Sequence, residues 1–337
     1  MPEPVTRVRS GPPAQTCNRL PAVSSEPSAA SADARYGFLG PAGTFTEAAL
    51  LQWLDGRNAE VVPYATVDAA VDAVRGGEVV AAMVPLENSV EGSVTATIDA
   101  LAGGPGLAII AEAQVPVSFS LLARPGATLN DVKGVTTHPH AHAQCRRWLA
   151  EELPGVPVTF APSTAMAASM VAQGEHDAAI SAPLAASVYG LDQLAADIGD
   201  RPAETRFVLI STPQPPQPAS GADKTSLVLF MGEDHPGALL EILTEFAVRG
   251  VNLTRIESRP TGGGIGDYFF SVDVEGHLDD ARVGEALMGL RRVCAEVRYL
   301  GSYPRIDGRE PVIRRGVADG EFRGAQAWLA RIREGRG

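Results

Sequence analysis

The stretch Glu204-Thr205-Arg206-Phe207-Val208-Leu209-Ile210 places a hydroxyl, a guanidinium and an aromatic ring at the start of an apolar run. Such a run is typical of a buried strand. A segment rich in proline follows directly, at residues 213–222, and this composition indicates a linker. We therefore expect one domain at residues 35–211 that this strand closes, a linker at 212–224, and a second domain after it.

Short apolar segments alternate with helical segments throughout residues 35–211. The run from Val79 to Leu86 is almost wholly apolar, as in a strand covered on both faces. Repeated strand–helix units predict an α/β domain that binds ligands at the carboxyl ends of its strands. The extended stretch from Leu107 to Leu122 contains Pro116, which predicts a bend or a crossing between two lobes with a cleft between them.

The segment at residues 225–304 has the strand and helix order βαββαβ, which is that of a ferredoxin-like fold. The expected elements are Ser226–Met231, Pro236–Arg249, Val251–Arg259, Tyr268–Val274, Asp279–Arg292 and Val297–Tyr303. A glycine run at 262–266 is interpreted as the hairpin turn between the two central strands. The tail at 305–337 contains one amphipathic patch, Phe322 to Ile332, and is either a docking helix or disordered. Residues 1–34 are rich in Pro, Ser and Ala, and we expect a disordered extension.

Composition excludes several classes of function. The 337-residue chain has a net charge of −12, which argues against a nucleic-acid partner. It contains no run of about 18 apolar residues, the length that a membrane span requires. Its three cysteines are far apart, which favours a reducing compartment and a cytoplasmic location.

No cofactor is expected from the sequence. It contains neither a GxxxxGK[ST] phosphate loop nor a GxSxG nucleophile elbow. His138, His140 and His142 invite a metal interpretation, but zinc usually needs a second cluster of ligands and none is evident. We therefore predict no metal site.

Polar side chains that follow apolar runs are the candidate site. Glu87, Asn88 and Ser89 come directly after the most apolar run, where α/β proteins bind ligands. Glu87 is either a general acid or base, or a residue that holds Asn88 in place. Thr44 and Gln144 have simpler interpretations as a helix cap and an exposed helix residue.

Several short motifs recur in order along the chain. They are Gly40-Pro41-Ala42-Gly43-Thr44-Phe45, Glu87-Asn88-Ser89-Val90-Glu91-Gly92, His138-Pro139 through Gln144-Cys145, Ser163-Thr164-Ala165, Thr205-Arg206-Phe207, Gly237-Ala238-Leu239-Leu240 and Glu257-Ser258-Arg259-Pro260. Each is weak alone, but their order and spacing over about 270 residues are specific. In these motifs residues 35–304 resemble the prephenate dehydratase family, with a catalytic domain and a regulatory ACT domain.

The resemblance implies a periplasmic-binding-protein-like catalytic domain that converts prephenate to phenylpyruvate, carbon dioxide and water. It also implies feedback inhibition by L-phenylalanine and a homodimer or homotetramer. The family's functional residues fall here on Glu87, Asn88, Thr137, Gln144 and Thr205. Relatives often have Ser at Thr137, and many have an Asn where Pro202-Ala203-Glu204 precedes the triplet.

The chemistry of prephenate suggests roles for these residues. Loss of hydroxide needs a donor near the departing oxygen, and Thr205 is our candidate, with Glu87 and Asn88 beside it. The expected substrate contacts are Thr44, Ser89, Thr137, Gln144, Arg206 and Phe207. Arg206 either pairs with a substrate carboxylate or forms a buried structural ion pair.

Effector binding is expected where Gly237 allows close approach to a helix N-terminus. The expected effector set is Gly237, Ala238, Leu239, Leu240, Asn252, Glu257, Ser258, Arg259 and Pro260, with the last five contributing across a dimer interface. Because the Thr-Arg-Phe triplet lies just before the linker, we also hypothesise that the sensor acts on the cleft at this point.

Two other functions remain open. A non-enzymatic amino-acid sensor would combine a binding-protein-like cleft with an ACT domain, but Glu87, Asn88 and Thr205 together argue against it. A decarboxylase that keeps the ring non-aromatic resembles this family but lacks the Thr-Arg-Phe triplet, which is intact here.

Overall fold

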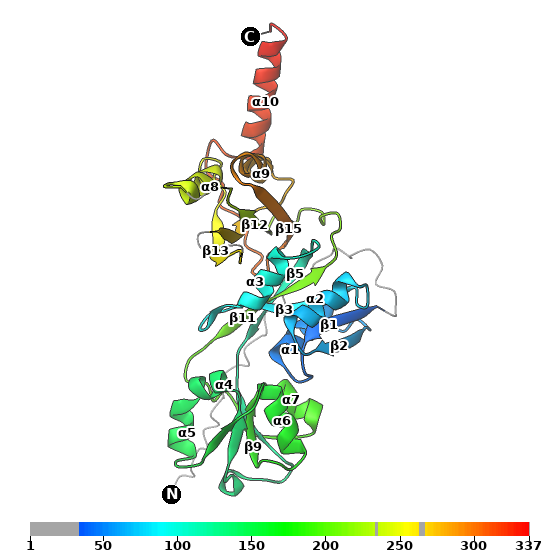
Figure 1. The fold of residues 1–337 in the computed structure, drawn as a ribbon, viewed down its shortest axis with the longest axis vertical. Helices are drawn as coiled ribbons and strands as arrows, with labels where there is room; N and C mark the ends of the chain where they lie inside the picture. Colours follow the sequence, from blue (N-terminus) through cyan, green and yellow to red (C-terminus); the bar gives the residue numbers. More distant parts are fainter. Residues whose placement is uncertain (1–33, 233–234, 263–266, 337) are drawn as a thin grey trace, which may run out of the picture.

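The computed structural model describes residues 34–232, 235–262 and 267–336, and its three sheets divide them into two α/β lobes and a smaller domain (Figure 1). This arrangement confirms the predicted α/β class with a second, ferredoxin-like domain. The extension expected at residues 1–34 lies outside the described residues, apart from Ala34, which packs in the first lobe. Within the described part, no helix is both long and apolar enough to cross a membrane.

The first lobe is built on a mixed sheet. In sheet order its strands are β2 (Glu60–Tyr64), β1 (Arg35–Leu39), β3 (Ala81–Asn88), β11 (Glu204–Ser211) and β5 (Ala108–Pro116), with β4 (Gly92–Ser93) paired to β3. β1 is parallel to β2 and β3, whereas β11 is antiparallel to both of its neighbours. The apolar run at β3 thus lies centrally, as predicted, although the sheet is not wholly parallel.

Helices cover both faces of this sheet, because its strands are apolar on both sides. α1 (Phe45–Leu54) packs on the face that carries Phe207 and Leu209. α2 (Val67–Arg75) and α3 (Thr95–Ala102) pack on the opposite face, with Val208 and Ile210. Successive residues of β11 therefore enter two different cores, as the pleat of a strand requires.

The second lobe has its own five-stranded sheet. In order its strands are β10 (Asp192–Ala195), β6 (Ser120–Ala123), β9 (Ala178–Ser181), β7 (Val135–Thr137) and β8 (Val158–Phe160), and its helices are α4 (Pro139–Gln144), α5 (Arg146–Glu152), α6 (Thr164–Ala172) and α7 (Leu184–Tyr189). The chain crosses between the lobes after Pro116 and returns after Ala195. The crossing predicted near Pro116 is confirmed.

One predicted helix is interrupted. We expect a single helix from Pro139 to Glu152, but the chain bends at Cys145 (φ −123°, ψ 15°) into α4 and α5. Asp200 is the cause, because its backbone N–H donates to the Gln144 carbonyl (2.6 Å) and its carboxylate accepts from the Arg147 N–H (3.1 Å). These bonds take the groups that a continuous helix would use internally.

The third unit has the predicted βαββαβ order. Its elements are β12 (Asp223–Phe230), α8 (Ala238–Ala247), β13 (Leu253–Pro260), β14 (Tyr268–Glu275), α9 (Ala281–Val293) and β15 (Glu296–Pro304), and the sheet order is β13-β14-β12-β15. Residues 263–266 of the glycine run lie outside the described residues, and β13 and β14 on either side of it pair antiparallel. α8 and α9 cover one face of this sheet.

The other face of this sheet packs directly on the first lobe. Val228, Phe269, Leu300 and Tyr303 belong to the same buried cluster as α2 and α3. At Gly301 (φ +145°) the approach is so close that an added Cβ would lie 2.2 Å from the Ile109 carbonyl oxygen. The two domains therefore share a continuous hydrophobic core.

Gly301→Ala is expected to destabilise the chain by about 1–3 kcal/mol, because the new methyl group forces β15 away from β5. Urea unfolding of the full-length variant measures the loss. Gly308→Ala is the matched control, since Gly308 also has a positive φ (+60°) but meets nothing within 4 Å of an added Cβ. An equal loss of stability in Gly301→Ala and Gly308→Ala would contradict the close approach of Gly301 to Ile109 as the cause.

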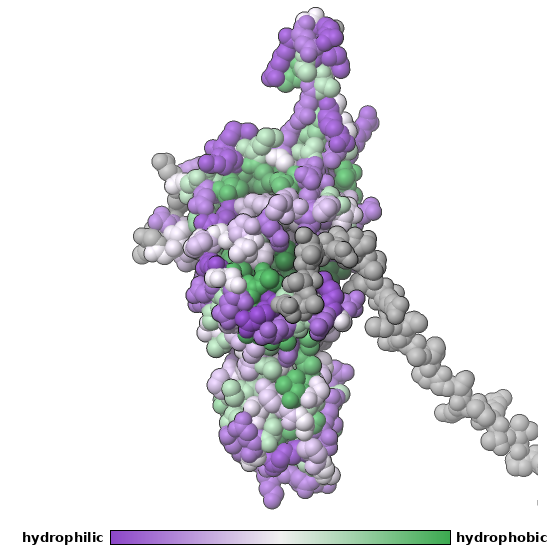
Figure 2. All heavy atoms as spheres, turned by 90° about the vertical axis from the view of Figure 1, so that its right-hand side faces the viewer, coloured by the Kyte–Doolittle hydropathy of each residue, from purple (hydrophilic) through white to green (hydrophobic). Residues whose placement is uncertain are grey.

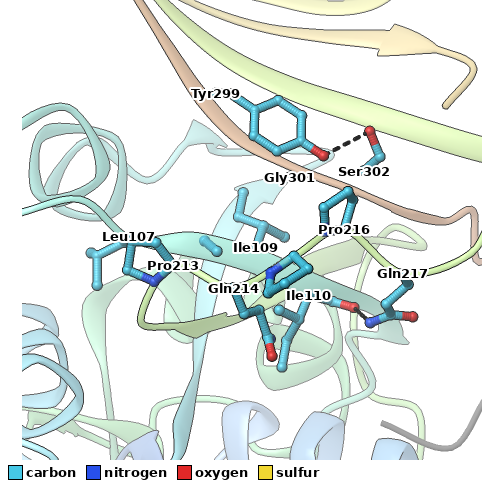
Figure 3. A pocket seen from close by; sticks show the side chains of 12 residues that line it. Leu107, Ile109, Ile110, Pro213, Gln214, Pro216, Gln217, Tyr299, Gly301 and Ser302 are labelled. Atoms are coloured by element: carbon cyan, nitrogen blue, oxygen red, sulfur yellow. Dashed lines mark hydrogen bonds between the residues drawn. The ribbon is translucent and has the colours of Figure 1, made fainter. Parts of the chain in front are cut away.

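The linker lies against the joint between the domains. Figure 3 shows it over β5 and β15, around a cavity of about 60 Å³ that Ile109, Pro213, Pro216 and Tyr299 help to line. This volume holds only a few water molecules. Gln217 fastens the linker by donating to the Ile110 carbonyl (2.8 Å). Beyond β15 the tail forms a helix, α10 (Asp319–Arg333), rather than being disordered.

Candidate active site

Asn88 and Thr205 lie opposite each other where β3 ends and β11 begins. The Asn88 amide Nδ2 donates to the Thr205 hydroxyl at 2.8 Å. The Asn88 carbonyl Oδ1 accepts from the backbone N–H groups of Val90 (2.8 Å) and Glu91 (3.0 Å), which fixes the orientation of the amide. Among the described residues no acceptor takes the Thr205 proton, so this hydroxyl is placed to donate to a ligand.

Ser89 fastens the start of β11 beside this pair. Its hydroxyl accepts from the Glu204 N–H (3.0 Å), and its own N–H donates to the Glu204 carbonyl (2.9 Å). In this structure the Ser89 hydroxyl makes a backbone contact, and the substrate contact expected of it stays a prediction. The effect of this backbone contact is to hold Thr205 in register with Asn88.

The second lobe reaches this region through α4. Gln144 Nε2 donates to the Glu91 carboxylate (3.3 Å), and His140 Nδ1 lies 3.6 Å from the other carboxylate oxygen. Burial and the neighbouring His140 lower the pKa of His138 below its usual value. Glu91 belongs to the motif at residues 87–92, and the sequence alone predicts no role for it. The feature that could have identified Glu91 is its position as a carboxylate in the polar loop after a buried strand.

Because the Gln144 amide already donates to the Glu91 carboxylate, Gln144 is placed to bind a carboxylate.

The two lobes also touch at the loop before α1. The Tyr189 hydroxyl donates to the Ala42 carbonyl (2.8 Å), and a Cβ added to Gly43 (φ +83°) would lie 3.1 Å from the Ala185 Cα. Thr44 follows as the N-cap of α1, with its hydroxyl accepting from the Glu47 N–H (3.3 Å). Its structure matches the simpler capping interpretation rather than the substrate contact.

Arg206 points away from Asn88 and Thr205, toward the βαββαβ domain. Its guanidinium donates to Glu112 (2.7 Å), Asp273 (2.6 Å) and the Tyr303 hydroxyl (3.0 Å), and it lies 3.4 Å from Glu87. Only 10% of the Arg206 side chain is exposed. Of the two roles expected for it, the structure therefore shows the buried ion pair and not the substrate contact.

Six buried or partly buried charges make up this network, which we call the interdomain charge cluster: Arg206, Lys224, Arg255, Glu87, Glu112 and Asp273. Its three cations balance its three carboxylates. Burial raises the pKa of Glu112, but Arg206 and Lys224 outweigh burial and hold it below its usual value. In the same way Arg206 and Arg255 overcome burial and lower the pKa of Asp273. Glu112 and Asp273 are therefore held in their ionised form despite their burial.

Three more sequence predictions need correction. Glu87 belongs to the interdomain charge cluster, where its carboxylate contacts Arg206 and Arg255, so it lies on the face opposite Asn88 and its side chain neither joins the Asn88–Thr205 pair nor holds the Asn88 amide. Phe207 is 2% exposed and packs in the core under α1. Thr137 is 0% exposed and donates to the Ile180 carbonyl (2.8 Å). For Glu87 the physical reason is strand alternation, which sends it to the face opposite that of Asn88. Phe207 is excluded as a substrate contact because the core under α1 encloses its ring.

The expected effector residues divide between two faces of the third sheet. Gly237 (φ +97°) precedes α8, and Ala238 helps to line a hollow of about 190 Å³ with Met231, Ile242 and Val293. Leu239 and Leu240 are exposed there, and Asn252 is an exposed residue before β13.

The other members of the effector set lie on β13. Glu257 accepts from the Ser93 hydroxyl (3.1 Å) and Arg259 pairs with Asp99 (2.9 Å), so both face the first lobe. Ser258 alternates to the helix face, and Pro260 ends the strand. Within one chain, Glu257 and Arg259 therefore do not join Gly237.

Fold and site together define a two-lobed small-molecule α/β protein with an attached βαββαβ domain. The family model for prephenate dehydratase matches residues 36–215, and the model for the ACT domain matches residues 226–292. The chain belongs to the prephenate dehydratase family.

Curated and solved relatives agree with this membership. The prephenate dehydratase of Mycobacterium marinum is 46% identical over 312 residues, 90% of this chain and 97% of that protein. The Arthrobacter aurescens prephenate dehydratase, solved in complex with L-Phe, is 52% identical with a TM-score of 0.85, covering 89% of this chain and 99% of that one. GqqA, described as a novel type of quorum quenching acylase, is 33% identical with a TM-score of 0.75, and the match covers 82% of this chain and 100% of that one.

Proposed function

We propose that the chain is a prephenate dehydratase that converts prephenate to phenylpyruvate, carbon dioxide and water. The observation that carries this proposal is the Asn88–Thr205 hydrogen bond at the end of the central strands. Prephenate carries a ring carboxylate and a ring hydroxyl on opposite carbons. Losing both makes an aromatic ring, so the reaction needs help mainly at the poor leaving group.

Thr205 is the donor to that leaving group. Because the Asn88 amide already donates to its oxygen, the hydroxyl proton is turned outward to the departing oxygen of prephenate. A hydrogen bond that strengthens as charge develops on this oxygen lowers the barrier, by about 2.7–4 kcal/mol for one well-placed donor. Thr205 has too high a pKa to act as a strong acid, so it donates a hydrogen bond or relays a proton.

Gln144 is the side chain we assign to a substrate carboxylate. Arg206 is committed to the interdomain charge cluster, so the arginine contact expected for the carboxylate is replaced by an amide. Gln144 already donates to the Glu91 carboxylate across the lobe junction (3.3 Å). An incoming carboxylate of prephenate takes this amide in exchange, and Glu91 moves aside.

Turnover of prephenate tests this function directly. Purified full-length chain is mixed with prephenate, and the phenylpyruvate formed is followed by its absorbance. We expect release of phenylpyruvate with one carbon dioxide. A product that keeps a non-aromatic ring would assign the chain to the decarboxylases, and no turnover would leave the amino-acid sensor as the function.

We further propose that L-phenylalanine inhibits the enzyme by binding to the ACT domain, in a cytoplasmic homodimer or homotetramer. The Arthrobacter aurescens relative in complex with L-Phe and the hollow beside Ala238 support this assignment. Cys145 and Cys294 are free and buried, in keeping with a reducing compartment.

The route from effector to active site runs through β13 in this proposal. Arg255, Glu257 and Arg259 of this strand contact Glu87, Ser93 and Asp99 of the first lobe. Since Glu87 directly precedes Asn88, a shift of β13 reaches the catalytic pair without passing through the linker. In place of a route at the triplet just before the linker, we therefore propose that the ACT domain acts on the first lobe by direct contact.

Gly237→Met is expected to leave prephenate turnover intact and to abolish inhibition by L-phenylalanine. Gly237 has φ +97°, which methionine adopts only with strain, and its side chain would enter the space at the start of α8. Inhibition is measured as turnover over a series of phenylalanine concentrations. Gly56→Met is the control, because Gly56 also has a positive φ (+76°) and open space but lies in the first lobe. Undiminished inhibition in Gly237→Met would place the effector elsewhere.

A further inference from the structure

The C-terminal helix α10 stands clear of the rest of the molecule, as Figures 1 and 2 show. Its described contacts with the body come from its first half. Asp319 accepts from the Ala281 N–H (3.0 Å), and Gln326 lies 3.5 Å from Glu285 of α9. None of its residues is buried.

One side of this helix is apolar. Phe322, Ala325, Leu329 and Ile332 recur at intervals of three or four residues and therefore form a stripe along one face, with Trp328 beside it. Trp328 is 55% exposed, Leu329 41% and Ile332 43%. We call this surface the α10 stripe.

The helix needs a partner to be stable. It has 15 residues, a length at which isolated helices are marginal in water. Gly320 and Gly324 lie inside it, and each lowers helix stability by about 1 kcal/mol relative to alanine. Packing of the α10 stripe on another surface is the way such a helix gains stability.

Charge identifies that partner as another α10. The first turn of the helix is acidic, with Asp319 and Glu321, and the last turn is basic, with Arg331 and Arg333. Two copies that lie antiparallel place each acidic end beside the basic end of the other, and their helix dipoles are then opposed as well. A lipid surface fits less well, because it favours basic residues along the whole polar face.

We propose that α10 joins two copies of this chain as an antiparallel helix pair. Two-fold symmetry then sets Phe322 against Ile332 of the second copy and Ala325 against its Leu329. The small Ala325 leaves room for the leucine opposite. This contact is separate from the catalytic pair and does not depend on the proposed reaction.

The mass of the assembly in solution tests the proposal. Light scattering after size exclusion is run on the full-length wild type and on Leu329→Asp/Ile332→Asp. We expect the variant to have half the wild-type mass, with prephenate turnover unchanged. Ala327→Asp is the matched control, because it adds the same charge to the opposite face of α10 and should leave the mass at the wild-type value. Equal masses for wild type and double variant, or an equal fall in the control, would overturn the proposal.

Cross-linking tests the antiparallel register. In a Cys17→Ser background, the single variants Ala325→Cys and Leu329→Cys are oxidised alone and as a mixture. An antiparallel pair predicts covalent dimers mainly in the mixture, since residue 325 faces residue 329. Dimers formed equally well by each variant alone would indicate a parallel pair and overturn the register. A monomeric wild type that sediments with anionic lipid vesicles would overturn the pairing and assign the stripe to a membrane surface.

Discussion

Replacing Thr205 with valine is expected to lower the kcat for prephenate by about 10²–10³-fold, because the departing hydroxide loses its hydrogen-bond donor. This range corresponds to about 2.7–4 kcal/mol of transition-state stabilisation. Valine keeps the shape of threonine but leaves the Asn88 amide without the acceptor it has at 2.8 Å. The measurement is steady-state turnover at saturating prephenate, so that the loss is seen in kcat.

Two variants separate this role from a structural one. Thr205→Ser keeps the hydroxyl and should stay within about tenfold of wild-type kcat, since only a methyl group is lost. Thr97→Val removes another buried hydroxyl of the first lobe, which donates to the Pro85 carbonyl (2.6 Å), and should affect stability rather than kcat. A Thr205→Val enzyme with near wild-type kcat would exclude the donor role.

Arg206→Met is expected to lower the free energy of unfolding by about 3–5 kcal/mol at pH 7. The guanidinium is the shared partner of Glu112 and Asp273, and without it these buried carboxylates lose their strongest cation. Chemical unfolding of the full-length chain measures the loss. Arg35→Met is the matched control, because the Arg35–Glu60 pair is largely exposed and should contribute about 0–1 kcal/mol.

The loss at Arg206 should depend on pH with a definite sign. In the wild type the pKa values of Glu112 and Asp273 lie below the usual 4.5 and 3.8, so their contribution is present above those values and is lost as the pH falls through the lowered ones. In Arg206→Met burial acts with less opposition and raises both pKa values.

As the pH falls, Glu112 and Asp273 of the variant therefore take up protons at a pH where both groups are still charged in the wild type. This removes the destabilisation that the unpaired charges cause in the variant. The difference in stability between the two proteins should therefore shrink between pH 7 and about pH 4.5. Unfolding curves at several pH values in this range measure it. A difference that is constant with pH would mean that lost packing, and not uncompensated charge, is the cause.

Much of the architecture could be read from local patterns. The alternation of apolar strands and helices predicted the α/β class, and the composition of residues 213–222 marked the junction before the βαββαβ segment. The cap of α1 followed from Thr44, because a hydroxyl before a helix satisfies a free backbone N–H. The motif order indicated the family, and the comparisons confirmed it.

The direction of side chains was harder to predict. Asn88 and Thr205 are 117 positions apart, and only the antiparallel register of β3 and β11 brings them together. Glu87 and Arg206 are their immediate neighbours, yet they point into the other domain. One available signal was Glu112, the single charged residue in the largely apolar segment Ala108–Pro116, since a buried charge requires a partner.

The sequence by itself determined which elements form and which family they belong to, because propensity, periodicity and turn residues act within a few positions along the chain. Only the tertiary structure decided that Thr205 faces Asn88 while Arg206 closes a charge cluster between two domains. The reason is that a one-residue step along a strand reverses the side to which a side chain points, and the partner on that side comes from a distant part of the chain. The three side chains of the Thr-Arg-Phe triplet thus lie in three different surroundings: the proposed catalytic pair, the domain interface and the core.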